Sequence, residues 1–315
     1  MTACVVGVDG GGSKTLARVA ALDGVTLGEG SAGGSNWESV GVAGAVAAIG
    51  AAVGDALSTA GRTGGDVLAA AFGLAGVDWP SDAATMSDAL GALALGGERW
   101  VDNDVMVALR AGCREGWGVA SNVGTGAVTA GRNQAGDVFR TMAVGWGEPS
   151  GASGMARDAL HSIAAAYHRT APATALTALV LGAVGASDEA ELFERLSRGR
   201  LRSSAGWAPL IGRAAVDGDD VAQRLLVAAG ERHGAMVVGV ANRLGMTGDG
   251  FDVAMSGSVH QAGDPWFAPA FARSVADGCP LASLVVASVP PVQGAVLLAV
   301  ALAGERASLT DRTGS

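Results

Sequence analysis

Cysteine, basic charge and aromatic side chains are scarce in this sequence of 315 residues. The three cysteines, Cys4, Cys113 and Cys279, are scattered and form no Cys-x-x-Cys pair, which argues against a disulfide framework, a zinc site or an iron–sulfur site. The formal net charge is −9, so we expect no general attraction to nucleic acid or to an anionic membrane. An anionic ligand would therefore have to be bound by a local group of hydrogen-bond donors or positive charges.

The apolar stretches favour neither a secretory leader nor a membrane span. The first ten residues carry no basic leader, and Gly7 and Asp9 interrupt their apolar run. The longest later stretch, residues 281 to 304, is divided by Pro290 and Pro291 into a strand-like half and a short helix, whereas a span needs about 20 mostly apolar residues. We therefore expect a cytoplasmic protein.

Glycine, in contrast, is abundant, and its first cluster raises the question of a P-loop. The segment VVGVDGGGSKTLARVAALDG runs from Val5 to Gly24. A P-loop requires a glycine directly before its lysine and a helix directly after it. Here Ser13 precedes Lys14, and the following short run stops at the hairpin dipeptide Asp23-Gly24. The segment therefore predicts a strand, a glycine loop and a second strand.

The rest of the first third predicts a mixed α/β domain. Apolar residues at helical spacing predict a helix over 42–57, with Ser39 as its cap. A strand over 66–74, a helix over 81–95, and a strand that ends at Asp102 and leads into another helix follow. This order is typical of one central sheet with flanking helices.

Residues 117 to 137 repeat the opening pattern. An apolar strand runs into Gly124-Thr125-Gly126, a second strand follows, and Ala135-Gly136 turns the chain as Asp23-Gly24 does. The repetition predicts a duplicated α/β domain with two glycine loops across one cleft; the alternative is a chance recurrence of hairpins in a chain with 50 glycines. We expect domains over 1–110, completed by a helix over 291–305, and over 111–290, enlarged by helices.

Both loops have the composition of an anion site. Strands that run into glycines expose backbone N–H groups, which bind phosphate, although tight hairpins also require glycine. The hydroxyls of Ser13, Thr15 and Thr125 add donors. Together the loops could hold the β- and γ-phosphates of a nucleotide.

Two carboxylates stand beside these predicted loops. Asp9, at a strand end, could orient Mg²⁺ through water or simply cap a turn. Asp104, at a strand-to-helix junction, could accept a proton from a substrate hydroxyl or cap its helix, and Asp102 is its rival.

Other polar residues give weaker signals. Asn36 and Trp37 lie in a polar loop and would suit a sugar, and Glu148 precedes a helix. The histidines, His161, His168, His233 and His260, show no metal-ligand spacing, and we expect them on the surface or on helices.

Eight motifs occur in order: VDGGGSKT, GLAGVD, NDVMVAL, VGTGAV, GRNQAG, GWGEPSGASG, AAVDGDDVA and SGSV. In order and spacing they resemble the N-acetylglucosamine and glucosamine kinases of the BadF/BadG/BcrA/BcrD ATPase family, within the actin-hexokinase-Hsp70 superfamily. The resemblance runs from about Val5 to Gly304 and is greatest to the glucosamine kinases of actinobacteria, which are rich in alanine and use arginine over lysine.

The resemblance implies two ribonuclease-H-like lobes with ATP and Mg²⁺ in the cleft and a hexosamine beside the γ-phosphate. It implies Asp104 as general base for the sugar 6-hydroxyl, with Asp9 and Asp104 near the metal. The residues assigned to ATP are Asp9, Gly10, Gly11, Gly12, Ser13, Lys14, Thr15, Gly124, Thr125, Gly126, Gly257 and Ser258. The residues assigned to the sugar are Asn36, Asn103, Asp104, Thr125 and Glu148.

One departure from the family pattern bears on the acceptor. N-acetylglucosamine kinases usually read Gly-Asp-Glu-Gly-Ser-Gly where this chain has residues 147–152, GEPSGA. Glu148 could hydrogen-bond a cationic 2-amine, an interaction worth roughly 1.5–3 kcal/mol. The prediction is thus an ATP- and Mg²⁺-dependent kinase that makes glucosamine 6-phosphate, with a homodimer as an open alternative.

Three other functions compete with this prediction. The first is an N-acetylglucosamine kinase. The second is an ATP-driven dehydratase activator, which needs cysteines for an iron–sulfur cluster that bridges a dimer. The third is a non-catalytic nucleotide-binding or sugar-sensing module.

Overall fold

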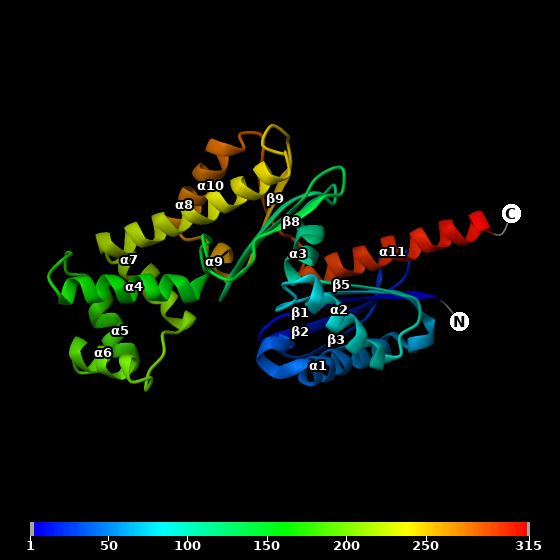
Figure 1. Ribbon diagram of the computed structural model, residues 1–315, viewed down its shortest axis with the longest axis horizontal. Helices are drawn as coiled ribbons and strands as arrows, with labels where there is room; N and C mark the ends of the chain where they lie inside the picture. Colours follow the sequence, from blue (N-terminus) through cyan, green and yellow to red (C-terminus); the bar gives the residue numbers. More distant parts are fainter. Residues whose placement is uncertain (1–2, 314–315) are drawn as a thin grey trace. The chain divides into compact units, whose positions relative to one another are not determined.

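The computed structural model describes residues 3 to 313, which form two compact units. The first unit comprises the chain up to Ala120 and from Val285 onward, and the second comprises Ser121–Leu284. Each unit contains one five-stranded sheet with helices packed on it (Figure 1). The predicted pair of α/β units is confirmed, and the division falls after the expected boundary at residue 110.

The two sheets have the same strand order. The first reads β3-β2-β1-β4-β5 and the second, in reverse, β8-β7-β6-β9-β10. The strands of the first unit are β1 (Cys4–Gly10), β2 (Lys14–Ala20), β3 (Thr26–Gly33), β4 (Val67–Leu74) and β5 (Glu98–Asp102). Those of the second are β6 (Gly118–Val123), β7 (Ala127–Arg132), β8 (Val138–Arg140), β9 (Asp252–Ser256) and β10 (Ser283–Val286). The repeated glycine motifs therefore mark a repeated topology.

Helices cover both faces of the first sheet (Figure 1). They are α1 (Trp37–Ala60), α2 (Pro80–Ala89), α3 (Asp104–Gly112) and α11 (Pro291–Thr313). Because successive side chains of a strand point to opposite faces, Val6 and Val8 of β1 pack in the cluster under α1, whereas Val5 packs with Val296 of α11. The buried residues of β1 thus form the middle of two cores.

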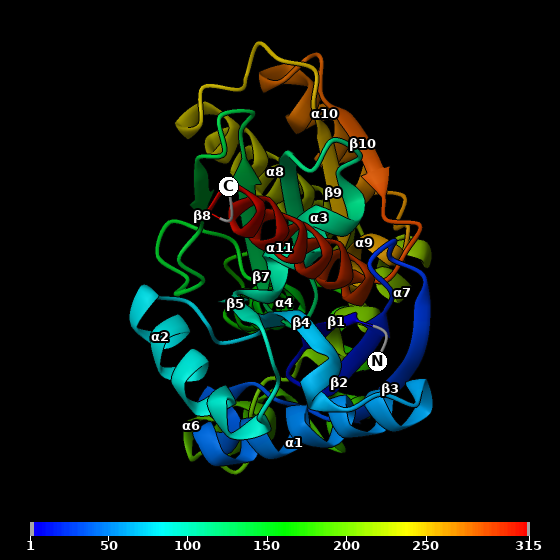
Figure 2. The same cartoon turned by 90° about the vertical axis from the view of Figure 1, so that its right-hand side faces the viewer.

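The C-terminal helix α11 completes the first unit. A side chain at Gly7 of β1 would collide with the backbone of Val296, and one at Gly294 would collide with Val107 of α3. These two glycines let α11 lie close to both β1 and α3 (Figure 2). Arg18 of β2 also donates a hydrogen bond to Gln293.

The second unit carries its extra helices between β8 and β9. They are α4 (Ala152–Tyr167), α5 (Leu176–Val184), α6 (Glu189–Ser197), α7 (Ala208–Val216) and α8 (Asp220–Arg243). The short α9 (Ser258–Gln261) and α10 (Phe267–Gly278) lie between β9 and β10. Gly230 and Gly234 let α8 approach α10 closely, because a side chain at either glycine would meet the α10 backbone. Short 3-10 turns occur at Gly64–Asp66, Leu90–Leu93 and Ala205–Trp207.

Helix α1 begins earlier than the sequence predicts. Its cap is Asn36, whose side chain accepts a hydrogen bond from the Glu38 N–H, and not Ser39. Gly41, at φ 72°, kinks the helix after its first turn, so the predicted periodicity describes only the part after the kink. By length and composition, α1 is the one described helix that could cross a membrane. The buried side chains of α1, however, pack on the first sheet. These side chains are Ala45, Ile49, Ala52, Val53 and Ala56.

Candidate functional site

Three parallel strands of the first unit end at one edge of the sheet. β1 pairs in parallel with β4, and β4 with β5, so that Asp9 aligns with Gly73 and Gly73 with Asp102. Ligands of such sheets bind at the carboxyl ends of the strands. The chain leaves these ends into the first glycine loop, the GLAGVD segment and the Asn103-Asp104 pair. The candidate residues of the first unit therefore gather at one edge.

The carboxylates of Asp9 and Asp104 lie close enough to repel each other. Burial and the negative charge of Asp104 raise the pKa of Asp9 to about 7, and the positive charge of Lys14 opposes this shift. A divalent cation would relieve the repulsion. Mg²⁺ is typically held by one or two carboxylates together with waters and substrate phosphates. The described residues contain no group of three or more metal-ligating side chains, so these two carboxylates fit Mg²⁺ only in that open form.

The first glycine loop turns its carbonyls inward. The carbonyls of Gly10 and Gly11 accept hydrogen bonds from Ala75 and Ser35 over 2.7 and 2.9 Å, and Gly34 lies against the Gly12 carbonyl. Within residues 3 to 313, no group accepts from the N–H groups of Gly12 and Ser13. Exposed N–H groups over inward carbonyls have the polarity of an anion-binding nest.

Of the polar side chains in this loop, Thr15 does not face solvent. Its hydroxyl donates to the Gly33 carbonyl over 2.7 Å and lies 2.9 Å from the Ser35 hydroxyl, and the residue is fully buried. Thr15 therefore fixes the loop to the end of β3. Ser13 and Lys14 are exposed. Because strand β2 starts at Lys14, the rejection of a P-loop is confirmed.

The second glycine loop repeats this polarity in the second unit. The Gly124 carbonyl accepts from the Ala152 N–H over 2.8 Å, and the Thr125 carbonyl accepts from the Ser153 N–H over 3.0 Å. A side chain at Gly151 would collide with the carbonyls of Gly124 and Gly126. Thr125 and Gly126 are not buried. The loop is thus carried by the first turn of α4, and its Gly124 N–H donates within the loop to the Gly126 carbonyl over 2.9 Å.

The turn at Gly257 lies against the end of β6. Its φ is 88°, and a side chain there would collide with the backbone of Val123. Only glycine fits this turn, which leads from β9 into Ser258 and α9.

Both predicted asparagines cap helices. Asn36 caps α1 and lies against Gly76, whose carbonyl accepts from the Trp37 indole over 2.6 Å. Asn103 is 1% exposed; its amide nitrogen donates to Asp78 over 3.0 Å, and its oxygen accepts from Val105. Asn103 therefore fixes the start of α3, where Asp104 is the first residue.

Glu148 holds its own loop. Its Oε1 accepts hydrogen bonds from the Val144 and Gly145 N–H groups over 2.8 and 3.1 Å. Trp146, between them and Glu148, is 82% exposed. The carboxylate assigned to the sugar thus also holds its loop, and among the described residues no hydrogen bond to its Oε2 is found.

Two of the four histidines have surroundings that the sequence did not predict. His161 and His168 lie at the outside of α4 and its end, whereas His233 is buried on α8, and His260 contacts the buried Phe271 ring from α9. All four thus lie on or beside helices, as expected. Only a non-local signal could have identified the partners of His233 and His260, because these partners lie in distant segments.

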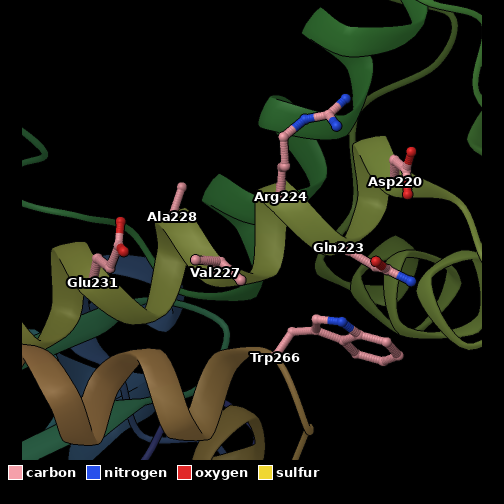
Figure 3. Close-up of a pocket in the computed structure, with 7 residues that line it drawn as sticks. All are labelled: Asp220, Gln223, Arg224, Val227, Ala228, Glu231 and Trp266. Atoms are coloured by element: carbon pink, nitrogen blue, oxygen red, sulfur yellow. The ribbon is translucent and has the colours of Figure 1, made fainter.

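A surface pocket of about 480 Å³ lies on one face of α8, apart from every predicted site residue. Figure 3 shows the Trp266 indole lying beneath that face. The lining residues are Asp220, Gln223, Arg224, Val227, Ala228, Glu231 and Trp266.

Comparison with known proteins gives relatives along nearly the whole chain. An N-acetyl-D-glucosamine kinase of Dictyostelium discoideum is 26% identical over 313 residues, covering 94% of this chain and 97% of the relative. An N-acetylmuramic acid/N-acetylglucosamine kinase of Clostridium acetobutylicum is 27% identical over 228 residues, covering 70% and 74%. A Chromobacterium violaceum crystal structure, provisionally named an N-acetylglucosamine kinase, has a TM-score of 0.71 at 25% identity, covering 94% and 99%.

These likenesses confirm the predicted actin-like fold of two ribonuclease-H-like units. The family model for the BadF/BadG/BcrA/BcrD ATPases matches residues 6–299, and the chain belongs to that family.

Proposed function

We propose that the chain is an ATP- and Mg²⁺-dependent hexosamine kinase that phosphorylates the 6-hydroxyl of glucosamine. The observation that carries the proposal is the pair of repelling carboxylates, Asp9 and Asp104, beside an exposed glycine loop. A metal site, a base and a phosphate nest at one sheet edge are the parts that phosphoryl transfer requires. The names of the relatives, which are amino-sugar kinases, support this assignment.

Asp104 acts as the general base in this proposal. As the sugar O6 bonds to the γ-phosphorus of ATP, the Asp104 carboxylate accepts the hydroxyl proton, and the bond from the γ-phosphorus to the bridging oxygen of ADP breaks. The products are ADP and glucosamine 6-phosphate. A positioned base is worth about 10²- to 10⁴-fold in rate. Asn103 supports this role because it caps α3 and thereby fixes the position of Asp104.

Asp9 holds the metal, with Asp104 beside it. Mg²⁺, when bound with ATP, neutralises charge that develops on the phosphate oxygens. In the chain itself, burial and repulsion make the Asp9 carboxylate unfavourable until a cation compensates it. This arrangement couples metal binding to substrate binding.

The two glycine loops bind phosphate oxygens of ATP through backbone N–H groups. Carbonyls turned inward at both loops support this role, because an anion then meets donors only. Lys14, exposed after the first loop, adds a positive charge that strengthens ATP binding. Gly257 and Ser258 form the turn that faces the nucleoside.

Glucosamine is the acceptor we favour, because Glu148 is a carboxylate at a position that the family resemblance assigns to the sugar. Both backbone N–H groups bind its Oε1, and Oε2 can accept a hydrogen bond from a cationic amine. N-acetylglucosamine is the second candidate, and the names of both curated relatives favour it.

The two rival classes fit the described chain less well. A dehydratase activator needs exposed cysteines for its cluster, whereas Cys4, Cys113 and Cys279 are buried. A non-catalytic module would have no need for Asp9 and Asp104, whose charge repulsion and burial destabilise the fold.

An ADP-release assay with glucosamine, N-acetylglucosamine and glucose tests the proposal. We expect turnover that depends on Mg²⁺, disappears with a chelator, and is fastest with glucosamine. Equal rates with glucosamine and N-acetylglucosamine would contradict the acceptor assignment. ADP binding without turnover on any hexose would contradict the kinase and favour the non-catalytic module.

A further inference from the structure

The buried His233 and the half-buried His260 of the second unit share one aromatic cluster. The His233 and His260 rings lie 5.8 and 5.5 Å from the Phe267 ring, and His260 lies 4.8 Å from the Phe271 ring. Burial lowers the pKa of both histidines to about 4; the positive charge of Arg232 lowers that of His233 further, and His233 lowers that of His260. Both rings are therefore neutral near pH 7.

His233 uses one ring nitrogen only. That nitrogen donates a hydrogen bond to the backbone carbonyl of Ser150. Its Nε2 is buried and has no hydrogen-bond partner among the described residues. An uncompensated buried polar atom costs stability, so packing alone does not explain a histidine here; a phenylalanine would fill the same space. The hydrogen bond to Ser150 is what distinguishes the histidine.

Ser150 stands directly before the segment that carries the second glycine loop. The next residue, Gly151, lies against the loop carbonyls, and the following N–H groups of Ala152 and Ser153 donate to Gly124 and Thr125. A shift of Ser150 would therefore be passed to the loop through these backbone contacts.

His260 reaches the same loop from the strand before it. Its Nε2 lies 3.0 Å from the hydroxyl of Ser121, a fully buried residue of β6. β6 ends two residues after Ser121, at Val123, and Gly124 follows directly. The two histidines thus fix the segments on either side of the second loop.

We propose that His233 and His260 are positioning residues that hold the second glycine loop in its nucleotide-binding shape, His233 through Ser150 and His260 through Ser121. Neither residue contacts the phosphates in this account. The inference rests on the proposed function, because it needs the loop to bind ATP.

Three variants test it, with ADP affinity measured by calorimetry alongside KM for ATP and for the sugar. His233→Phe keeps the ring volume and removes the hydrogen bond, and Ser121→Ala removes the partner of His260. We expect each to weaken ADP binding and raise KM for ATP about tenfold, the size of one lost hydrogen bond, with KM for the sugar unchanged. His233→Asn, whose amide can donate like the imidazole N–H, should restore most of the affinity. His161→Phe, at an exposed histidine, is the matched control.

Unchanged ADP affinity in folded His233→Phe and Ser121→Ala would overturn the inference. It would also be overturned if both variants had a lower unfolding temperature and lost affinity for ATP and for the sugar to the same extent. If His233→Phe does not fold, Ser121→Ala and His233→Asn decide by the same criteria. Wild-type protein that binds no ADP would contradict the proposed function itself, whereas a normal wild type with unaffected variants contradicts this inference alone.

Discussion

At the carboxyl edge of the first sheet, burial and the negative charge of the nearby Asp104 together raise the pKa of Asp9 to about 7. Such an arrangement is unfavourable for folding. Perturbed carboxylates of this kind cluster at functional sites, although structural networks also produce them. We therefore expect a substitution that removes this repulsion to raise the stability of the fold and to lower the activity.

Asp9→Asn should stabilise the fold and lower the activity. The amide removes a buried charge and its repulsion, so we expect the free energy of unfolding at pH 8 to rise by about 2 kcal/mol. Turnover should fall at least tenfold, because an amide is a poor ligand for Mg²⁺. Urea denaturation and an ADP-release assay measure the two effects, and the exposed Asp55→Asn is the control. A destabilised Asp9→Asn with normal turnover would refute this interpretation.

Gly33 and Gly34, at the end of β3 beside the first glycine loop, are a matched pair of neighbouring glycines. A methyl group at Gly34 would collide with the Gly12 carbonyl, whereas one at Gly33 meets nothing within 4 Å. Gly34→Ala should therefore displace the loop and raise KM for ATP several-fold, and Gly33→Ala should not. The comparison uses steady-state kinetics at saturating sugar. Similar KM values for both variants would show that the loop shape does not govern nucleotide binding.

Glu148→Gln separates the charge of this residue from its role as a cap. The amide oxygen can still accept from Val144 and Gly145, so the loop should keep its shape. We expect KM for glucosamine to rise about tenfold, since a hydrogen bond to a charged group is stronger by about 1–2 kcal/mol than a neutral one, and KM for N-acetylglucosamine to stay unchanged. If both KM values change equally, Glu148 acts on the loop and not on the amine.

His233 and His260 predict a pH dependence of stability. Their folded pKa values are about 4, below the unfolded value of 6.5, so the unfolded chain binds more protons between pH 6.5 and 4. Their contribution is fully present above pH 6.5 and is lost as the pH falls through that window. Because a tenfold change in a proton-binding constant corresponds to about 1.4 kcal/mol, the total loss amounts to several kcal/mol.

Urea denaturation at pH 8, 6 and 5 measures this slope. A double variant with phenylalanine at His233 and His260 should lose most of it, while His161→Phe should retain it. The same slope in wild type and double variant would assign the pH dependence to other groups.

Local sequence patterns predicted the fold well, because turns and hairpins are determined by residues that are close together in the sequence. The dipeptide Asp23-Gly24 turns β2 into β3 with Gly24 at φ 84°, and two glycine-loop hairpins predicted two sheets of equal topology. Asn36 was missed as the α1 cap because the kink at Gly41 separates it from the regular periodicity.

The site was predictable only in part. The sequence placed Asp9 and Asp104 at strand ends, but not their mutual effect on the pKa of Asp9, which depends on strand pairing. It did not reveal that the buried Asn103 side chain is hydrogen-bonded to Asp78, nor that His233 is hydrogen-bonded to the backbone of Ser150. Both contacts join segments that are far apart in the chain. The roles assigned to the loops, Glu148 and the likeness to actinobacterial glucosamine kinases stay predictions.

The turnover of Asp104→Asn with glucosamine and Mg-ATP tests the central claim most directly. Asn103, which caps α3, is unchanged in this variant, and the new amide cannot accept the proton. The account therefore predicts a fall in kcat of about 10²- to 10⁴-fold at nearly unchanged ADP affinity and unfolding temperature. The exposed Asp88→Asn should match wild type. A folded Asp104→Asn whose kcat stays within a few-fold of wild type would contradict the account.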